Sequence, residues 1–281
     1  MSEKIYDLII VGAGPAGMTA SIYASRANMS VLMLERKYPG GQMLSTEEIE
    51  NYTGYEMITG PELSEKMFEH SKKFGTEFAF GNITKVGEKD GLKYVVAGEK
   101  EYVAKSIIIA TGSHARLLPF IPAFNTPEGE ALKNKVLTST ELLDIDHVPQ
   151  TMAIIGAGVI GLELASAFET FGSKVTVIEF LKECLPSIDS DIAKRLRKTL
   201  EKRGINFNMN SGVKSIVATE DKKQAIVTFE QKGQEKKVIA DIVLVATGRA
   251  ANIEGLGLEI AGINCVKQGI ETNEHYETNI P

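Results

Sequence analysis

Short runs of apolar residues recur along this 281-residue chain, and several of them run into a glycine or end at an acidic residue. Apolar runs of three to five residues without polar alternation are typical of strands buried on both faces, as in a parallel sheet covered by helices. We therefore expect buried strands at residues 7–11, 31–34, 105–109, 153–155 and 175–178. The pattern predicts an α/β fold.

Other stretches have the spacing of amphipathic helices. We expect helices over residues 15–27, 61–75 and 189–204, and a short one that begins near Ser139. In the first helix, Ala, Met, Ile and Tyr side chains should form the inner face. In the third, Ile192, Leu196 and Leu200 follow each other at four-residue intervals, so we expect them on one buried face.

The remaining segments are β-like or irregular. A β-like pattern runs from residue 77 to 103, and strands are expected at 213–218, 225–230 and 237–245. Residues 113–150 are rich in proline and mixed in charge, which is typical of a connection between domains rather than of a core element.

Two of the buried strands run into the same glycine-rich turn, at residues 12–17 and 156–161. Such a turn leads into a helix whose first N–H groups and positive dipole end attract a phosphate. An acidic residue closes the following strand, 23 positions after the first glycine in both cases; these residues are Glu35 and Glu179. A carboxylate at this position accepts hydrogen bonds from ribose hydroxyls. Two such units predict two dinucleotide sites, and electron transfer between two cofactors.

The repeat extends beyond these turns, because residues 110–112 and 246–248 both read Ala-Thr-Gly after an apolar strand. In a doubly wound sheet the carboxyl end of such a strand faces the cofactor crevice. The loop at Gly40, Gly41 and Gln42 is also suited to a ligand. Its two glycines let the backbone approach a flat ligand closely, and the Gln42 amide offers both a hydrogen-bond donor and an acceptor.

These motifs together resemble the flavin-dependent pyridine nucleotide-disulfide oxidoreductases. Residues 5–114 resemble bacterial thioredoxin reductase, through residues 12–20, Pro39-Gly40-Gly41-Gln42 and Glu48-Ile49-Glu50-Asn51-Tyr52. Residues 137–280 resemble dihydrolipoamide dehydrogenase, through Thr138-Ser139-Thr140-Glu141, residues 156–163, Leu185-Pro186 and Ala246-Thr247-Gly248-Arg249. The resemblance covers nearly the whole chain.

The resemblance implies that the first turn binds FAD. The FAD-binding residues that it implies are Gly12, Gly14, Pro15, Ala16, Glu35, Arg36, Gly41, Gln42, Asn51, Val86, Ala110, Thr111 and Gly112. The second turn would bind a nicotinamide dinucleotide through Gly156, Gly158, Val159, Ile160, Gly161, Glu179 and Gly248.

The acidic residue of the second unit also bears on which nicotinamide cofactor is used. Glu179 would accept from a free 2′-hydroxyl and repel a 2′-phosphate, and no arginine occurs in the following Phe180-Leu181-Lys182. NADH is therefore favoured over NADPH, and the chain's cofactors are expected to be FAD and NAD.

The resemblance also implies the domain order: two Rossmann-like dinucleotide-binding domains, with the NAD domain inserted into the FAD domain. We expect residues 1–117 to form the first segment of the FAD domain, 118–250 the NAD(P)H domain, and 251–281 a return segment of the FAD domain. A homodimer is also suggested, since both parent subfamilies are dimers, but the sequence leaves the oligomeric state open.

The chain departs from both subfamilies in its cysteines. Each subfamily passes electrons through a nearby pair of thiols, whereas this chain has only Cys184 and Cys265, which form no such pair. Residues 43–47, which follow the Gly41-Gln42 loop, are Met-Leu-Ser-Thr-Glu. Thiol–disulfide exchange needs an attacking and a resolving thiol. Reduction of a disulfide by this chain alone is not expected, and no catalytic residue is assigned.

A second departure lies after Thr278-Asn279-Ile280-Pro281, where the family continues with a Gly-Asp motif at the flavin ribitol. We therefore expect a truncated or engineered chain, or a piece of a longer enzyme, and FAD retention is open. His114 and His275 are expected to be ordinary surface or core histidines rather than replacements for a family catalytic histidine.

The net charge and the lengths of the apolar runs indicate which kinds of partner are not expected. The net charge is −6 and no apolar run approaches the roughly 18 residues of a membrane span, which argues against nucleic-acid and membrane partners. We expect a cytoplasmic protein. The main hypothesis is an NADH-dependent FAD oxidoreductase with an unidentified small-molecule or protein electron acceptor. The alternative is a dinucleotide-binding module without turnover.

Overall fold

The computed structural model describes residues 4–122 and 125–281, which divide into two compact units. Unit one comprises residues 1–114 and 250–281, and unit two comprises residues 115–249. The chain therefore leaves unit one, forms unit two and returns, at two crossings that coincide with the short strands β7 (Ser113–Ala115) and β16 (Arg249–Ala251).

Unit one is built on a six-stranded sheet in the order β3-β2-β1-β6-β5-β4. Its strands are β1 (Ile5–Val11), β2 (Val31–Glu35), β3 (Glu77–Phe80), β4 (Ile83–Lys89), β5 (Leu92–Ala97) and β6 (Lys100–Ile109). Strands β3, β2, β1 and β6 are parallel, and β5 and β4 extend the sheet antiparallel. The run at 105–109 is thus the end of a ten-residue strand. The expectation that this run is buried is wrong, since Ile107 and Ile109 are only half-buried and Ile108 is exposed.

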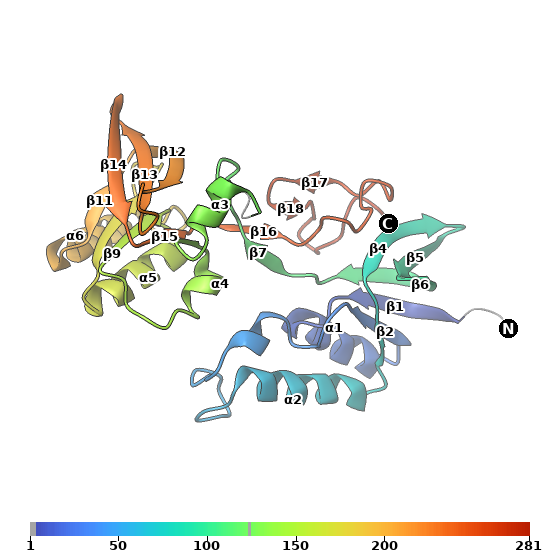
Figure 1. Ribbon diagram of the computed structural model, residues 1–281. Coiled ribbons are helices and arrows are strands. Elements are labelled where there is room, and N and C mark those ends of the chain that lie inside the picture. Colours follow the sequence, from blue (N-terminus) through green and yellow to red (C-terminus); the bar gives the residue numbers. More distant parts are fainter. Residues whose placement is uncertain (1–3, 123–124) are drawn as a thin grey trace. The chain divides into compact units, whose positions relative to one another are not determined.

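The sheet is covered on both faces at β1 and β2, which explains the unbroken apolar runs of these two strands. Leu8 and Ile10 of β1 pack against α1 (Pro15–Arg26) and α2 (Gly60–Lys73), whereas Ile9 and Val11 pack on the opposite face with Leu256 of the return segment. Figure 1 shows α1 and α2 together on one side of β1 and β2. The 3₁₀ turn η1 (Gly41–Ser45) precedes α2, and the return segment contains the hairpin β17 (Cys265–Val266) and β18 (Gly269–Ile270).

The inner face of α1 differs from the prediction. Tyr23 is exposed, and the buried positions are Gly17, Met18, Ser21 and Ser25. The two serine hydroxyls are hydrogen-bonded, Ser21 to the Met18 carbonyl oxygen and Ser25 to Thr76, so these small polar residues are buried without an unpaired group.

Unit two repeats the same plan with a five-stranded parallel sheet in the order β11-β10-β9-β15-β8. Its strands are β8 (Val136–Leu137), β9 (Thr151–Ile155), β10 (Lys174–Ile178), β11 (Asn206–Asn208) and β15 (Ile242–Val245). Its helices are α3 (Pro127–Leu132), α4 (Ser139–Leu142), α5 (Val159–Thr170) and α6 (Ser190–Arg203). An antiparallel meander of β12 (Ser211–Ala218), β13 (Ala225–Gln231) and β14 (Gln234–Ala240) completes the unit (Figure 1).

Alternate residues of β9 again point to opposite faces of the sheet. Met152 and Ile154 pack in the core with the helices α5 and α6, and Ala153 and Ile155 pack in the core with the meander. The segment 113–150, predicted as a connection with one short helix near Ser139, contains that helix as α4 and also contributes α3 and the edge strand β8. Helix α3 begins after Thr126, whose hydroxyl accepts a hydrogen bond from Gly129 N and so acts as an N-cap.

Two predictions for unit two are wrong. The single strand expected at 237–245 is two strands, β14 and β15. The chain breaks at Asp241 between them, because Thr151 N and Thr151 Oγ1 both donate hydrogen bonds to Asp241 Oδ2. The buried face of α6 is also rotated: Ile192 and Leu196 are exposed, whereas Ala193 and Leu200 are buried.

Candidate cofactor sites

The first glycine turn joins β1 to α1 and packs directly on the end of β6. Gly12 has a φ of 106°, and a Cβ added to it would lie 2.5 Å from the Ala110 carbonyl oxygen. A Cβ on Gly17 would lie 1.9 Å from the carbonyl oxygen of Gly12. No side chain fits at either position, so helix α1 can approach the end of the sheet only because both residues are glycine.

The second turn, between β9 and α5, has the same construction. Gly156 also has a φ of 106°, and its added Cβ would lie 2.4 Å from the Ala246 carbonyl oxygen. A Cβ on Gly161 would lie 2.1 Å from the carbonyl oxygen of Gly156. The alanine of each Ala-Thr-Gly motif therefore forms the surface on which the first glycine of its unit packs. This explains why the two motifs occur together in both halves of the sequence.

Each acidic residue at the end of the second strand is bonded to the glycine turn of its own unit. Glu35 Oε2 accepts from Ala13 N at 2.9 Å, and Glu179 Oε2 accepts from Ala157 N at 2.6 Å. The other oxygen of Glu179 accepts from Leu181 N at 2.7 Å. A carboxylate has about four acceptor positions, so both residues can still accept from a ribose. These bonds hold each carboxylate beside its turn before any ligand binds.

The central glycine of each turn is open on its outer side. Nothing lies within 4 Å of a Cβ added to Gly14 or Gly158, and each residue is the N-cap of its helix without a side-chain cap. Pro15, Ala16 and Val159 in the first turns of the helices are exposed. The first N–H groups of a helix have no intrahelical partner. An open cradle of this kind fits a pyrophosphate.

Unit one contains a cavity of about 280 Å³ at the carboxyl ends of its strands. Four of the predicted FAD-binding residues line it: Gly12, Glu35, Arg36 and Thr111. Four further polar residues in its wall were not predicted as site residues: Asn82, His114, Asn252 and Glu254. The cavity thus joins residues from β2, the end of β6 and the return segment, in a place and of a kind that suit the adenosine end of FAD.

Asn252 ties the return segment to the Ala-Thr-Gly loop of unit one. Its amide Nδ2 donates to the Thr111 carbonyl oxygen at 2.8 Å, and its backbone N donates to the Gly112 carbonyl oxygen at 2.9 Å. Thr111 Oγ1 in turn donates to the Asn252 carbonyl oxygen at 2.7 Å. Asn252 Oδ1 lies 2.7 Å from His114 Nδ1 and can only accept, so that histidine nitrogen carries the hydrogen. His114 is therefore an exposed residue of the cavity wall.

The other predicted FAD residues have different surroundings. Gln42 Nε2 donates to the Ser113 carbonyl oxygen at 2.6 Å, and Gly41 would place a Cβ 3.3 Å from Gly14 Cα, so this loop lies against the first turn. Asn51 is exposed. Val86 is buried in the core, and its N donates to the Leu256 carbonyl oxygen. Roles for Asn51 and Val86 stay predictions.

The remaining predicted residues of unit two lie around the second turn. Ile160 is half-buried in the first turn of α5, next to Val159. Gly248 is exposed with a φ of 105°, and its carbonyl oxygen accepts from Arg116 N at 3.0 Å.

Cys184 does not have the surroundings of a reactive redox thiol, and the two cysteines belong to different units. Cys184 is buried, its Sγ lies 3.4 Å from the Ala193 carbonyl oxygen, and burial raises the pKa of its thiol to about 11. Cys265 is exposed in the hairpin of unit one, and both residues are free thiols. A thiol attacks a disulfide only as the thiolate, so Cys184 is poorly suited to this role.

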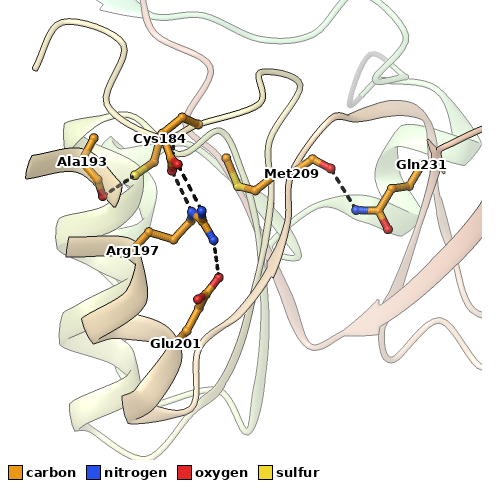
Figure 2. Close-up of polar contacts among 7 residues, drawn as sticks. Cys184, Ala193, Arg197, Glu201, Met209 and Gln231 are labelled. Atoms are coloured by element: carbon orange, nitrogen blue, oxygen red, sulfur yellow. Dashed lines mark hydrogen bonds and ion pairs between the residues drawn. The ribbon is translucent and has the colours of Figure 1, made fainter. Parts of the chain in front are cut away.

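The loop that carries Cys184 is fixed to α6 by an ion pair. Arg197 Nε and Nη2 donate to the two carboxylate oxygens of Glu183 at 2.7 and 3.1 Å, and Nη1 donates to Glu201 at 2.6 Å. The guanidinium holds the pKa of Glu183 down at about 2. Figure 2 shows Arg197 between Glu201 and the Cys184 loop, on the same side of α6 as Ala193. This inward arginine explains why the apolar face of α6 differs from the predicted one.

Two other features bear on ligand class. None of the helices in the described part of the chain combines the length and the apolar character needed to span a membrane. Residues 4–122 and 125–281 also contain no group of three His, Cys, Asp or Glu side chains that could hold a metal ion.

Two Rossmann-like units, one inserted into the other and each with its own glycine turn and acid, define the two-dinucleotide-binding flavoprotein class. The chain belongs to the pyridine nucleotide-disulphide oxidoreductase family, whose model matches residues 6–281. The family implies an oxidoreductase that uses FAD and a pyridine nucleotide. The family and the fold predicted from the sequence are thus confirmed.

Relatives of both predicted kinds are found. The chain is 37% identical to thioredoxin reductase of Bacillus subtilis over 286 residues, which cover 99% of this chain and 84% of the relative. It is 32% identical to dihydrolipoyl dehydrogenase of Acholeplasma laidlawii over 308 residues, with 99% and 88% covered. The structure of Lactococcus lactis thioredoxin reductase in its FR conformation superimposes with a TM-score of 0.76 at 34% identity, covering 98% of this chain and 88% of that one.

Proposed function

We propose that this protein is an NADH-dependent FAD oxidoreductase that passes the electrons of NADH to an acceptor other than a disulfide. The observation that carries the proposal is the repeated site geometry. Each unit has an open glycine turn at a helix N-terminus, and each has one carboxylate bonded to the second residue of that turn.

The two sites have separate roles in this proposal. Unit one binds FAD through Gly12, Gly14, Pro15, Ala16, Glu35, Arg36, Gly41, Gln42, Asn51, Val86, Ala110, Thr111 and Gly112. Unit two binds NADH through Gly156, Gly158, Val159, Ile160, Gly161, Glu179 and Gly248. When bound, FAD supplies the redox chemistry, since it can accept a hydride from the nicotinamide and release the electrons to an acceptor.

The protein's own residues bind and orient the two dinucleotides. The N–H groups at the start of α1 and α5 bind the pyrophosphates, and Glu35 and Glu179 accept from the adenosine riboses. Asn252 holds the Thr111–Gly112 loop in the cavity wall through its two side-chain hydrogen bonds and its backbone bonds. No side chain is needed as a general acid or base.

The preference for NADH rests on Glu179. Its carboxylate is fixed next to the turn by Ala157 N and Leu181 N, so it cannot turn away from a 2′-phosphate without losing both hydrogen bonds. The next two residues, Phe180 and Leu181, are exposed and apolar, and neither can pair with a phosphate.

The nature of the acceptor rests on the thiols. Cys184 is buried with a raised thiol pKa, and Cys265 belongs to the other unit. The proposed acceptor is therefore a small molecule or a protein that takes electrons directly from the reduced flavin. A homodimeric state and a location in the cytoplasm stay predictions.

The experiment is anaerobic addition of NADH to the purified protein, monitored by its visible spectrum. The expected result is a yellow protein whose flavin absorbance is bleached by NADH and returns on addition of an acceptor such as ferricyanide. A yellow protein that NADH does not bleach would overturn the proposal. A colourless protein that still binds NADH would favour a dinucleotide-binding module without turnover.

A further inference from the structure

Phe180 is a large apolar side chain that directly follows the acidic residue of unit two, and 77% of it is exposed. One edge of its ring lies over Gly212 of β12, where a Cβ added to the glycine would contact Phe180 Cδ2 at 3.7 Å and Cε2 at 3.9 Å. The ring is thus supported by backbone on one side and open on the rest of its surface.

The backbone that carries this ring is fixed on both sides. Glu179 N donates to the Asn208 carbonyl oxygen at 2.9 Å, and Ser211 N donates to the Glu179 carbonyl oxygen at 2.8 Å. Asn210 N donates to the Leu181 carbonyl oxygen at 3.0 Å. Phe180 is therefore held in place by its neighbours' hydrogen bonds, and its ring contributes little to the core. Its position needs another explanation.

We propose that Phe180 is the stacking surface for the adenine of the nicotinamide dinucleotide. This inference rests on the proposed function, which places the adenosine ribose at Glu179. The base is bonded directly to that ribose, so it must lie close to the residue next to the acid. A purine can stack on an exposed aromatic ring. Replacing such a ring by alanine removes the stacking and weakens binding on the order of tenfold.

The chain contains no tryptophan, so a single introduced tryptophan reports on its own surroundings. In the Phe180→Trp variant, titration with ADP-ribose is expected to quench the tryptophan emission as the adenine stacks on the indole. The matched control is Phe171→Trp, also at an exposed position (62%) but at the C-terminal end of the twelve-residue helix α5. That end is about 18 Å from the glycine turn at the start of the helix, so its emission should not respond.

Affinity gives a second readout that does not depend on turnover. Calorimetry should show Phe180→Ala binding ADP-ribose about tenfold more weakly than the wild type. Reduced nicotinamide mononucleotide, which lacks the adenosine, should reduce the flavin of the variant as well as it does that of the wild type. A Phe180→Leu variant, which keeps an apolar side chain without a ring, should behave like the alanine variant.

Four results would overturn the inference. If the wild type binds ADP-ribose but Phe180→Trp emission does not change, or Phe180→Ala binds it as tightly as the wild type, Phe180 does not contact the base although the site exists. If the emission changes with protein concentration alone, Phe180 contacts a second copy of the chain instead. If the wild type does not bind ADP-ribose at all, the dinucleotide site of the proposed function fails as well.

Discussion

The backbone N of Ala157 donates a 2.6 Å hydrogen bond to the carboxylate of Glu179, and Ala13 and Glu35 repeat this relationship in the other unit at 2.9 Å. The acid at the end of the second strand is thereby attached to the turn that we propose binds the phosphates. A ligand that spans ribose and pyrophosphate meets both groups already in place, which lowers the ordering cost of binding.

The first prediction concerns nicotinamide specificity. Glu179→Gln removes the charge that repels a 2′-phosphate and weakens the bond to the 2′-hydroxyl, and hydrogen bonds to charged groups contribute about 1.5–3 kcal/mol. We expect kcat/KM with NADH to fall on the order of tenfold, and the NADH-to-NADPH ratio to fall further. Steady-state reduction of ferricyanide with each nucleotide measures both values.

The matched control for this variant is Glu35→Gln, the equivalent change in unit one. It should lower the affinity for FAD and leave the NADH-to-NADPH ratio unchanged. If both variants shift the ratio equally, Glu179 does not select the nucleotide.

The second prediction separates folding from phosphate binding. Gly158 has a φ of −77°, which any residue adopts, and an added Cβ meets nothing within 4 Å. Gly158→Ala should therefore change the free energy of unfolding by less than about 1 kcal/mol. Its methyl group should nevertheless keep a pyrophosphate away from the backbone and raise the KM for NADH on the order of tenfold.

Gly156→Ala supplies the contrast, because its Cβ would lie 2.4 Å from the Ala246 carbonyl oxygen at a φ of 106°. This variant should lose several kcal/mol of stability, roughly the cost of a strained backbone plus a steric overlap. The two variants are distinguished by measuring both the Tm of thermal unfolding and the affinity for NADH of each. Equal Tm losses would contradict the open surroundings of Gly158, and an unchanged KM for NADH in Gly158→Ala would contradict its assignment to the cradle.

The third prediction concerns Asn252, whose side chain bonds to Thr111 and His114 in the cavity wall. Asn252→Ala removes two hydrogen bonds of about 1 kcal/mol each, and FAD affinity should fall on the order of tenfold. Flavin release measured by fluorescence after dilution gives the dissociation constant. His114→Ala removes only one of these bonds and should cost less; a larger loss from His114→Ala would contradict the positioning role of Asn252.

The parts of this site that the sequence predicted are those encoded within a few residues. A local pattern is enough to find the first glycine and the acid of each strand–turn–helix–strand unit. The acid follows the glycine by 23 positions in both units, Gly12 with Glu35 and Gly156 with Glu179. Asn252 could not be found in this way. It acts on residues about 140 positions earlier, and only the folded return segment brings them together.

The two errors in unit two have the same origin. The face of α6 was predicted from apolar spacing alone, whereas the inward position belongs to Arg197, whose partner Glu183 lies on a preceding loop. The break between β14 and β15 depends on Asp241 and Thr151, which are 90 residues apart. Periodicity records burial but not the long-range polar pairs that compete with it.

The fourth prediction concerns the pH dependence of stability. The pKa of Glu183 is lowered to about 2 by Arg197, so the ion pair's contribution is complete above the unfolded-state pKa of about 4.3 and is lost as the pH falls towards 2. Glu183→Gln should reduce the free energy of unfolding by roughly 2–3 kcal/mol near neutral pH, as a pKa difference of this size implies. Urea unfolding over this pH range measures the difference between variant and wild type. A difference that does not shrink below about pH 4 would contradict this origin.

The fifth prediction tests the thiols directly. At neutral pH, Cys265 is exposed and should react readily with a thiol reagent, whereas Cys184 is buried with a thiol pKa of about 11 and should react only on unfolding. The count of fast-reacting thiols should therefore be one per chain, and Cys265→Ser should abolish it. The double variant Cys184→Ser, Cys265→Ser should keep NADH–ferricyanide activity within about twofold of the wild type, since a thiol is not part of the proposed electron path. A much larger loss of activity in a folded, flavin-containing double variant would show that electrons pass through a cysteine and would overturn direct transfer from the flavin.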